Sequence, residues 1–156
     1  MRALVQRVTR ASVRADGELV AETGPGLVVL VGIGHADDAA VADALARRIA
    51  ELRIFADHDG RTNRSILDTG GEVLVVSQFT LYADTSRGRR PGFTDAAAPE
   101  LARSLCERFA DAFRGLGVAR VETGRFGAEM AVELVNDGPF TIWLDTADRR
   151  IAPART

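Results

Sequence analysis

The sequence predicts a single α+β domain whose strands, mostly antiparallel, form barrel-like sheets accompanied by two α-helices. Short alternating or wholly apolar runs separated by Gly, Pro and Asp indicate many strands, and two longer segments repeat apolar residues with a helical period. The chain has 156 residues, which fits one domain with a sizeable core. No linker-like change in composition and no internal repeat divides it. We therefore place one domain at residues 1–145 and a C-terminal tail at residues 146–156.

The first half of the chain is expected to form a hairpin, a buried strand and a helix. Polar and apolar residues interleave over residues 3–14, and Asp16-Gly17 then supplies a tight turn. Residues 27–34 are apolar throughout, which is typical of a strand buried on both faces. Aspartates at 37–38 provide helix-start chemistry, and the apolar face of the helix follows at Val41, Leu45, Ile49 and Leu52. A short strand at 52–57 and a loop at 58–63 come next.

The second half is expected to contain a buried strand at 72–84, a long loop at 85–98 and a second helix. Pro99 suits the first turn of that helix and Gly117 its C-terminal end. Its apolar face consists of Leu101, Leu105, Phe109, Phe113 and Leu116. Another strand is expected at 118–124.

The segment LVNDGPFTIWLD (134–145) is typical of a β-hairpin, because Asp137-Gly138 is a strong turn signal between two alternating runs. The next residue, Pro139, has no N–H to donate to a strand ladder. The Gly-Pro peptide therefore either simply ends one strand and begins the next, or is a rigid piece of main chain presented to another molecule.

Composition excludes several classes of protein. The formal net charge of −2 argues against a generic nucleic-acid coat or a polybasic membrane protein, although all 20 cationic residues are Arg. One cysteine permits no intrachain disulfide and favours a reducing compartment. The first residues lack the apolar core of a secretory signal, and no apolar run reaches the length of a membrane span. We expect a cytoplasmic enzyme or binding protein that does not engage a membrane.

The strongest candidates for chemistry are Ser77, Gln78, Phe79 and Thr80, at the polar end of an apolar strand. Hydroxyls there could attack a carbonyl or hold a water, and backbone N–H groups could form an oxyanion hole. The alternative is that polar residues simply mark where burial stops. No G-x-S-x-G surrounds the serine, and both histidines lie in expected loops, so a conventional triad is not favoured.

Metal, nucleotide and thiol signatures are poor. Residues 57–63 begin like a calcium loop but carry Arg and Thr where a ligand and the glycine should stand. Residues 32–37 supply two glycines of a dinucleotide fingerprint, with Asp37 in the third position, where it would repel a pyrophosphate. Cys106, between Leu105 and Phe109, suits a small core position better than a nucleophile. We expect neither a metal nor a cofactor.

Three arginines, Arg87, Arg89 and Arg90, concentrate positive charge in the long loop. They suit contact with phosphate, and a solvated loop is the alternative. A non-catalytic nucleic-acid-binding module that uses the Arg87–Arg90 loop is therefore the competing function. The near-neutral total charge and the lack of an aromatic stacking row count against it.

Taken together, several stretches closely resemble the D-aminoacyl-tRNA deacylases, from Met1 to about Asp145. Their order and spacing carry the resemblance: MRALVQRV at the start, SQFTL (77–81), GRRPGFT (88–94), ETGRFGAEM (122–130) and ELVNDGPFT (133–141). Small departures stand beside the arginine loop, with Gly92 in place of an expected serine and Ala83 where glycine is common.

The resemblance implies a homodimer with active sites at the subunit interface, acting on the ester between a D-amino acid and the terminal ribose of tRNA. It implies that Gly138-Pro139 is a cis peptide that reaches into the partner's pocket from the Asn136-containing motif. An L side chain would meet this main-chain wall, a D side chain would point away, and glycine, as on mischarged tRNA(Ala), would be accepted. L-aminoacyl groups would thus be rejected sterically.

The resemblance also implies roles for individual residues. Arg7 either orients the Gly-Pro carbonyls or is an ordinary strand arginine. The backbone near Ser77, Gln78 and Phe79 would bind the terminal adenosine and the reacting carbonyl. Thr80 is either a nucleophile or a residue that positions water and substrate. Because no base is apparent to deprotonate it, we favour direct attack by water, assisted by the substrate's ribose hydroxyl.

Overall fold

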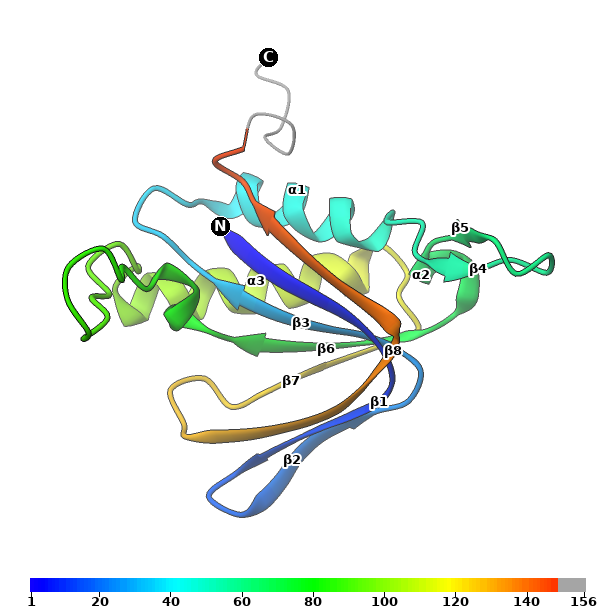
Figure 1. Cartoon of the computed structure of the whole chain (residues 1–156), viewed down its shortest axis with the longest axis horizontal. Helices are drawn as coiled ribbons and strands as arrows, with labels where there is room; N and C mark the ends of the chain where they lie inside the picture. The colour runs from blue at the N-terminus through cyan, green and yellow to red at the C-terminus, as the bar shows by residue number, and fades with distance from the viewer. Residues whose placement is uncertain (149–156) are drawn as a thin grey trace.

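A six-stranded mixed sheet curls on itself, and two long helices cover one of its faces (Figure 1). The computed structural model describes residues 1–148. The elements in chain order are β1 (Arg2–Ala15), β2 (Glu18–Thr23), β3 (Gly26–Gly32), α1 (Ala39–Ala50), β4 (Phe55–Ala56), β5 (Thr62–Arg64), α2 (Ile66–Thr69), β6 (Glu72–Ser77), the 3-10 helix η1 (Phe79–Tyr82), α3 (Pro99–Gly115), β7 (Arg120–Thr123) and β8 (Met130–Asp145). None of the helices within residues 1–148 is long and apolar enough to cross a membrane.

Strand β1 organises the sheet because it has neighbours on both sides. Its first half pairs with β3 and its second half with β2, while β8 runs antiparallel along its other edge over nearly the full length. Strand β6 pairs in parallel with β3 and with β7. The antiparallel pairings around β1 and the bend of its two halves produce the curl. The predicted strand-rich, barrel-like α+β domain is confirmed.

The core has two parts, one on each face of β3 and β6. Val29 and Val31 face the helices, where the rings of Phe109 and Phe113 meet edge to face with centroids 5.1 Å apart. Val28 lies in the second cluster, inside the curl of the sheet. Successive side chains of a strand point to opposite faces, so an apolar strand with a core on each side is buried throughout. The buried strand predicted at 27–34 is found as β3, which ends at Gly32 and in which Leu30 is partly exposed, and residues 73–76 of the buried strand predicted at 72–84 are buried.

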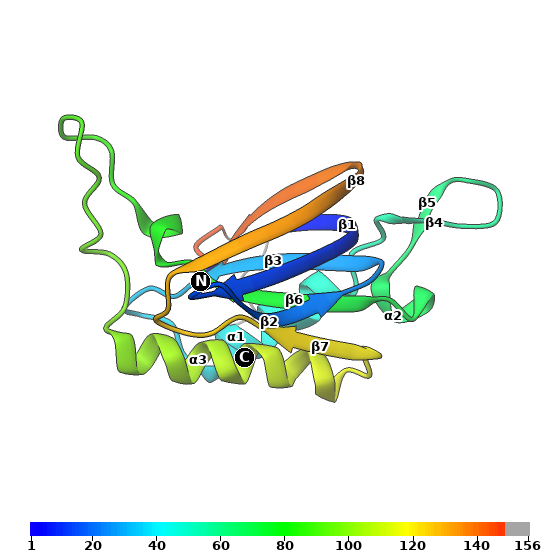
Figure 2. The same ribbon diagram turned by 90° about the horizontal axis from the view of Figure 1, so that it is seen from below.

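Both long helices occupy the predicted segments. Helix α1 follows Asp38, whose carboxylate accepts the N–H of Val41 at 2.9 Å and so caps the first turn. Helix α3 begins at Pro99, as expected. Figure 2 shows the two helices side by side beneath the sheet. The one-turn helix α2 was not predicted, since four residues carry no period. Strand β4 lies within the strand predicted at 52–57 but has only two residues, and β5 begins inside the loop predicted at 58–63, so the β4–β5 pairing was not predicted.

The predicted strand at 72–84 is too long, because β6 ends at Ser77. Gln78 adopts φ −144° and ψ 80°, and η1 begins directly after it. The turn packs η1 beneath β3, where a Cβ on Gly32 would lie 3.2 Å from the Leu81 side chain. The chain thus leaves the sheet at the motif that sequence analysis singled out.

The predicted hairpin at 134–145 is wrong, because these residues belong to the single strand β8. Asn136 is opposite Val8 and Thr141 is opposite Gln6, so both halves of the segment pair with the same strand. Only Arg7 separates the two β1 partners, whereas residues 137–140 separate the two on β8. The extra residues of β8 form a wide bulge, in which Gly138, with a φ of +108°, accommodates the extra length.

The expected cis peptide at Gly138-Pro139 is also not found, since no peptide bond within residues 1–148 is cis. A trans bond lets β8 continue in one direction through the bulge and resume pairing with β1 at Thr141. The positive φ of Gly138, rather than a cis bond, accommodates the extra residues of the bulge here.

Candidate functional site

Three residues of the motif, Ser77, Gln78 and Phe79, line a cavity of about 560 Å³, and Thr80 follows them directly in η1. The cavity opens between the end of β6, the start of α3 and the loop before β8, and its wall is mostly apolar and aromatic. Its lining includes Ser77, Gln78, Phe79, Phe93, Phe126 and Met130. A largely apolar cavity with a few polar groups at one end is the usual form of a small-molecule site.

Gln78 and Thr80 are held to each other, because the Gln78 amide donates to the Thr80 hydroxyl. Phe79, between them, is 57% exposed and meets Phe93 edge to face, with ring centroids 5.0 Å apart. The N–H groups of Phe79 and Thr80 are the first two of η1, and the first N–H groups of a helix have no acceptor within that helix. The motif therefore presents a side-chain pair, an exposed ring and two available N–H donors on one short turn.

The arginine loop is continuous with this motif. Asp84 and Gly92 exchange backbone hydrogen bonds of 2.8 and 2.9 Å, which close the base of the loop directly after η1. Arg87, Arg89 and Arg90 are exposed on the excursion beyond that base, which extends from the body of the domain (Figure 2). Between residues of the described range 1–148, none of the three forms an ion pair. Three exposed positive charges thus lie on a loop that begins directly after the Ser77–Thr80 motif.

No conventional base or nucleophile accompanies the motif. His35 Nε2 lies 2.6 Å from the Thr94 carbonyl oxygen, and His58 is an exposed residue of the β4–β5 hairpin. Cys106 lines the cavity, but burial and the nearby Glu107 carboxylate raise the pKa of its thiol to about 12. A thiol with that pKa stays protonated at neutral pH and is a poor nucleophile.

The Gly-Pro bulge is held in place by Arg7 and Asn136. The Arg7 side chain, only 12% exposed, pairs through Nε with the Asp137 carboxylate at 3.0 Å and also donates to the Ile54 carbonyl. The guanidinium lies 4.2 Å above the Phe140 ring. The Asn136 amide donates to the carbonyls of Arg7 and Phe140 at 2.8 and 3.0 Å, across the neck of the bulge.

The exposed Gly138 and Pro139 stand at the tip of this bulge. Because the neck is fixed by a buried guanidinium and by an amide with two acceptors, the tip is a rigid projection. Of the alternatives that the sequence left open for Arg7, an ordinary exposed strand arginine does not match its burial and contacts.

Within one chain the bulge and the Ser77–Thr80 motif are far apart. Asn136 is opposite Val8, which is opposite Gly26. Gly26 is opposite Glu72, the first residue of β6, whereas Ser77 is the last. At about 3.3 Å per residue, the five steps along β6 amount to roughly 17 Å. The structure therefore divides the predicted site residues into two groups at opposite ends of the sheet.

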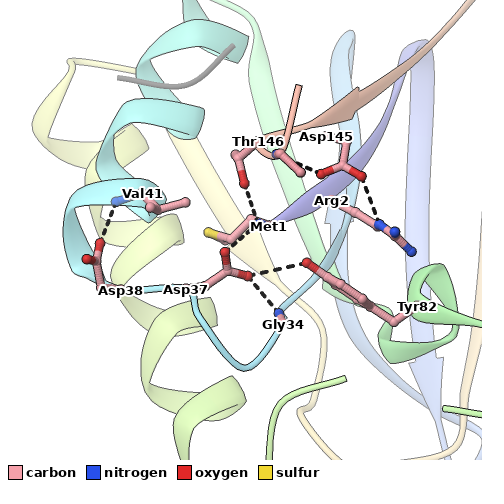
Figure 3. Close-up of polar contacts among 10 residues, drawn as sticks. Met1, Arg2, Gly34, Asp37, Asp38, Val41, Tyr82, Asp145 and Thr146 are labelled. Atoms are coloured by element: carbon pink, nitrogen blue, oxygen red, sulfur yellow. Dashed lines mark hydrogen bonds and ion pairs between the residues drawn. The ribbon is translucent and has the colours of Figure 1, made fainter. Parts of the chain in front are cut away.

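Sequence analysis missed a polar cluster behind η1, drawn in Figure 3. Arg2 donates to the Leu81 carbonyl at 3.0 Å and pairs with Asp145 at 3.0 Å. Tyr82 donates to Asp37, 3.4 Å away, whose carboxylate also accepts the Gly34 N–H at 2.6 Å and the Met1 amino group at 2.5 Å. Arg2 lies in the stretch MRALVQRV, Asp37 in residues 32–37 and Tyr82 directly after SQFTL, but no local signal indicated that these side chains meet.

Comparison with known proteins identifies the family. The model of the D-Tyr-tRNA(Tyr) deacylase family matches residues 4–145. The chain belongs to this family. A D-aminoacyl-tRNA deacylase of Thermomicrobium roseum is 59% identical over 150 residues, which cover 96% of this chain and 97% of that protein. Another D-aminoacyl-tRNA deacylase, from Dinoroseobacter shibae, is 64% identical over 146 residues, which cover 93% of this chain and 99% of that protein.

A solved structure named c-Myc DNA Unwinding Element Binding Protein has the same fold, with a TM-score of 0.87 and 39% identity. The matched part covers 93% of this chain and 98% of that one. The resemblance of the sequence to the deacylases is thus confirmed. The family match spans both groups of site residues, from Arg7 to the Gly-Pro bulge, whereas Arg2 and Thr146 lie outside it.

Proposed function

We propose that this chain is an enzyme that hydrolyses the ester of D-aminoacyl-tRNA to release a free D-amino acid and tRNA. The observation that carries the proposal is the position of Ser77, Gln78 and Phe79, which line a cavity of about 560 Å³ in a chain of the deacylase family. The cavity is large enough for a nucleoside. Three exposed arginines on the loop that follows the motif would contact the phosphates of the same substrate.

The chemistry requires no covalent intermediate. Water adds to the ester carbonyl carbon, the negative charge develops on the carbonyl oxygen, and the bond to the ribose oxygen then breaks as that oxygen gains a proton. The N–H groups of Phe79 and Thr80 would stabilise the developing oxyanion, and one such donor contributes about 10²–10³ in kcat. The neighbouring ribose hydroxyl of the substrate would assist the proton transfer. The Thr80 hydroxyl, held by Gln78, would position water or substrate.

Selectivity for the D configuration would come from the Gly138-Pro139 bulge of a second copy of the chain. The bulge is offset by roughly 17 Å along the sheet from Ser77 of its own chain, so it would serve the site of a partner in a homodimer. Main-chain atoms held by Arg7 and Asn136 cannot swing aside through a rotamer change. They would exclude an L side chain by overlap, while a D side chain points away and glycine offers nothing to exclude.

The remaining assignments concern the substrate's location and the enzyme's surroundings. The terminal adenosine would occupy the apolar cavity against the motif backbone, and Arg87, Arg89 and Arg90 would contact tRNA phosphates. We assign the deacylase domain to residues 1–145 and a tail to residues 146–156, of which 149–156 lie outside the described residues. The reaction as proposed uses no cofactor or metal, and we place the enzyme in the cytoplasm, where its substrate is made.

The decisive experiment compares hydrolysis of D-tyrosyl-tRNA, L-tyrosyl-tRNA and glycyl-tRNA(Ala), with a metal chelator present throughout. We expect rapid loss of the D-tyrosyl and glycyl esters while the L-tyrosyl ester persists. Turnover of the D and L esters at equal rates would overturn the exclusion mechanism, and no turnover of any ester would overturn the activity. A Thr80→Ala variant adds a test of the chemistry, because loss of all turnover with binding intact would make Thr80 the nucleophile.

A nucleic-acid-binding module remains the second candidate, because the solved relative at 39% identity is named for binding a DNA element. The Arg87–Arg90 loop would be its contact surface. Salt-dependent binding of uncharged tRNA or duplex DNA without ester hydrolysis would favour this function over the first.

A further inference from the structure

The short helix η1, which carries Phe79 and Thr80, is fixed from behind by four residues that come from four separate parts of the chain. These are Arg2 at the start of β1, Asp37 before α1, Tyr82 at the end of η1 and Asp145 at the end of β8, and we call them the η1 clamp (Figure 3). We propose that the η1 clamp is a positioning device for catalysis, in which Arg2 and Tyr82 fix the direction in which the N–H groups of Phe79 and Thr80 point. The inference rests on the proposed function.

Arg2 makes three contacts in the clamp through its guanidinium. Its Nε lies 3.0 Å from Asp145 Oδ2, its Nη1 donates to the Leu81 carbonyl at 3.0 Å, and its Cζ lies 4.4 Å from the centre of the Tyr82 ring. Arg2 and Asp145 are also directly opposite each other in the β1–β8 ladder, so the sheet fixes the backbone position from which the Arg2 side chain extends. Arg2 is therefore a rigid link between the sheet and a carbonyl inside η1.

Tyr82 provides the second attachment. Its hydroxyl donates to Asp37 Oδ2 over 3.4 Å, and its ring lies so close to Gly34 that a Cβ there would be 2.7 Å from the hydroxyl oxygen. Burial and the nearby Asp37 carboxylate raise the pKa of the phenol, so the hydroxyl stays protonated and remains a donor. The ring is thus confined by Arg2 on one side and by the β3–α1 connection on the other.

Apart from the clamp, η1 is attached to the sheet by the packing of Leu81 beneath Gly32 and by the Gln78 N–H, which donates to the Val31 carbonyl at 2.8 Å. It has only four residues, none of which is fully buried, and the N–H groups of Leu81 and Ala83 donate to the carbonyls of Gln78 and Thr80. A turn with no fully buried side chain is positioned only weakly by core packing, so its position also depends on the polar attachments of the clamp. In catalysis a misplacement of about 1 Å can cost about 100-fold in rate. The clamp can therefore change the rate of catalysis strongly without touching the substrate.

The test uses Arg2→Met and Tyr82→Phe, with Arg108→Met as a matched control. Arg108 makes an equally well-formed exposed pair with Asp43, at 2.7 and 2.5 Å between α3 and α1, away from the cavity. We expect Arg2→Met to lower kcat for D-tyrosyl-tRNA about 10- to 100-fold with KM changed less than about threefold. Tyr82→Phe should lower kcat by a smaller factor, because its hydrogen bond is long, and Arg108→Met should leave kcat unchanged.

Two further measurements separate positioning from general stability. In the free protein, the amide chemical shifts of Phe79 and Thr80 should move in Arg2→Met and stay in place in Arg108→Met. An Arg2→Lys variant, which can reach either Leu81 or Asp145 but not both, should recover part of kcat. Unchanged kcat per folded molecule in both clamp variants, or unmoved amide shifts, would overturn the inference.

The two proposals fail in different ways. A wild-type enzyme without turnover would refute the proposed function, while the amide shifts would still report on the clamp. If Arg2→Met does not fold, the Tyr82→Phe kcat and shifts decide alone, since loss of one hydroxyl at a half-buried ring is tolerated by the fold. The ratio of D to L turnover should not change in any of these variants, because a separate part of the chain provides the selectivity.

Discussion

Replacing Gly138 by alanine changes the tip of the bulge by one methyl group, and two separate costs follow from the structure. The residue has φ +108°, a region that costs an alanine about 1–2 kcal/mol. The added Cβ would also overlap Arg7 Nη2 and lie 3.0 Å from Phe140 Cδ2. The guanidinium would have to leave its place between Asp137 and the Ile54 carbonyl, which costs about 1–3 kcal/mol for a largely buried charged group.

The sum is a loss of about 3 kcal/mol in the free energy of unfolding. For a chain of this length, each kcal/mol corresponds to about 2–4 °C in Tm, so the expected fall is about 6–12 °C. Gly60→Ala is the matched control. Gly60 has φ +77° with nothing within 4 Å of an added Cβ, so it bears only the backbone cost of about 1–2 kcal/mol.

Thermal and urea unfolding of both variants give the stability difference, and turnover of D- and L-tyrosyl-tRNA well below Tm gives the functional consequence. A displaced Arg7 would no longer fix the Gly-Pro tip, so hydrolysis of the L ester should rise at least about tenfold relative to the D ester, equivalent to about 1.4 kcal/mol of lost discrimination. If Gly138→Ala is no less stable than Gly60→Ala, the contact with Arg7 does not hold the bulge, and the reasoning is refuted.

Three further changes test other parts of the molecule. Replacing Arg87, Arg89 and Arg90 together by Gln should weaken tRNA binding and reduce the slope of log K against log salt by up to about three, with kcat at saturating substrate unchanged; an unaltered slope would remove the loop from the interface. Cys106→Ala should retain activity. The raised pKa of this thiol means that its stabilising contribution is complete below pH 9.0 and is lost as pH rises toward about 12, so wild type should lose about 1 kcal/mol more than Cys106→Ala between pH 9 and pH 10 in urea unfolding. Asn136→Asp replaces an amide that donates to two carbonyls by a carboxylate facing them, so it should lower stability by about 2–4 kcal/mol at pH 7 and by less at pH 4; equal losses at both pH values would contradict this.

Much of the fold could be predicted because its signals are local. The apolar runs of β3 and β6 and the helical spacing of α1 and α3 are each contained in one stretch of chain. The change from apolar to polar residues marked Ser77–Thr80 as a place where burial decreases, but the expected strand extended to residue 84, whereas β6 ends at Ser77. The strand end was missed because Leu81 and Tyr82 continue an apolar pattern in a 3-10 turn that packs against the sheet.

The errors arose where a partner distant in sequence decides the local structure. Asp137-Gly138 is a hairpin turn when the flanking runs pair with each other, and a wide bulge when both pair with a third strand. Here the third strand is β1, some 130 residues earlier, and the sequence of β8 alone cannot report it. The η1 clamp was invisible for the same reason, because Arg2 and Asp145 meet only after β1 and β8 have paired.

The distance between the Gly-Pro tip and the cavity of the same chain has a genetic consequence for the proposed dimer. A chain altered at Gly138 would damage only its neighbour's site, and a chain altered at Thr80 only its own. A dimer of one chain altered at Gly138 and one altered at Thr80 would therefore contain one fully wild-type site. If equal amounts of the two chains pair at random, about a quarter of all sites would be wild type. Two defective alleles would complement each other inside the cell, whereas two alleles damaged at the same end of the sheet would not.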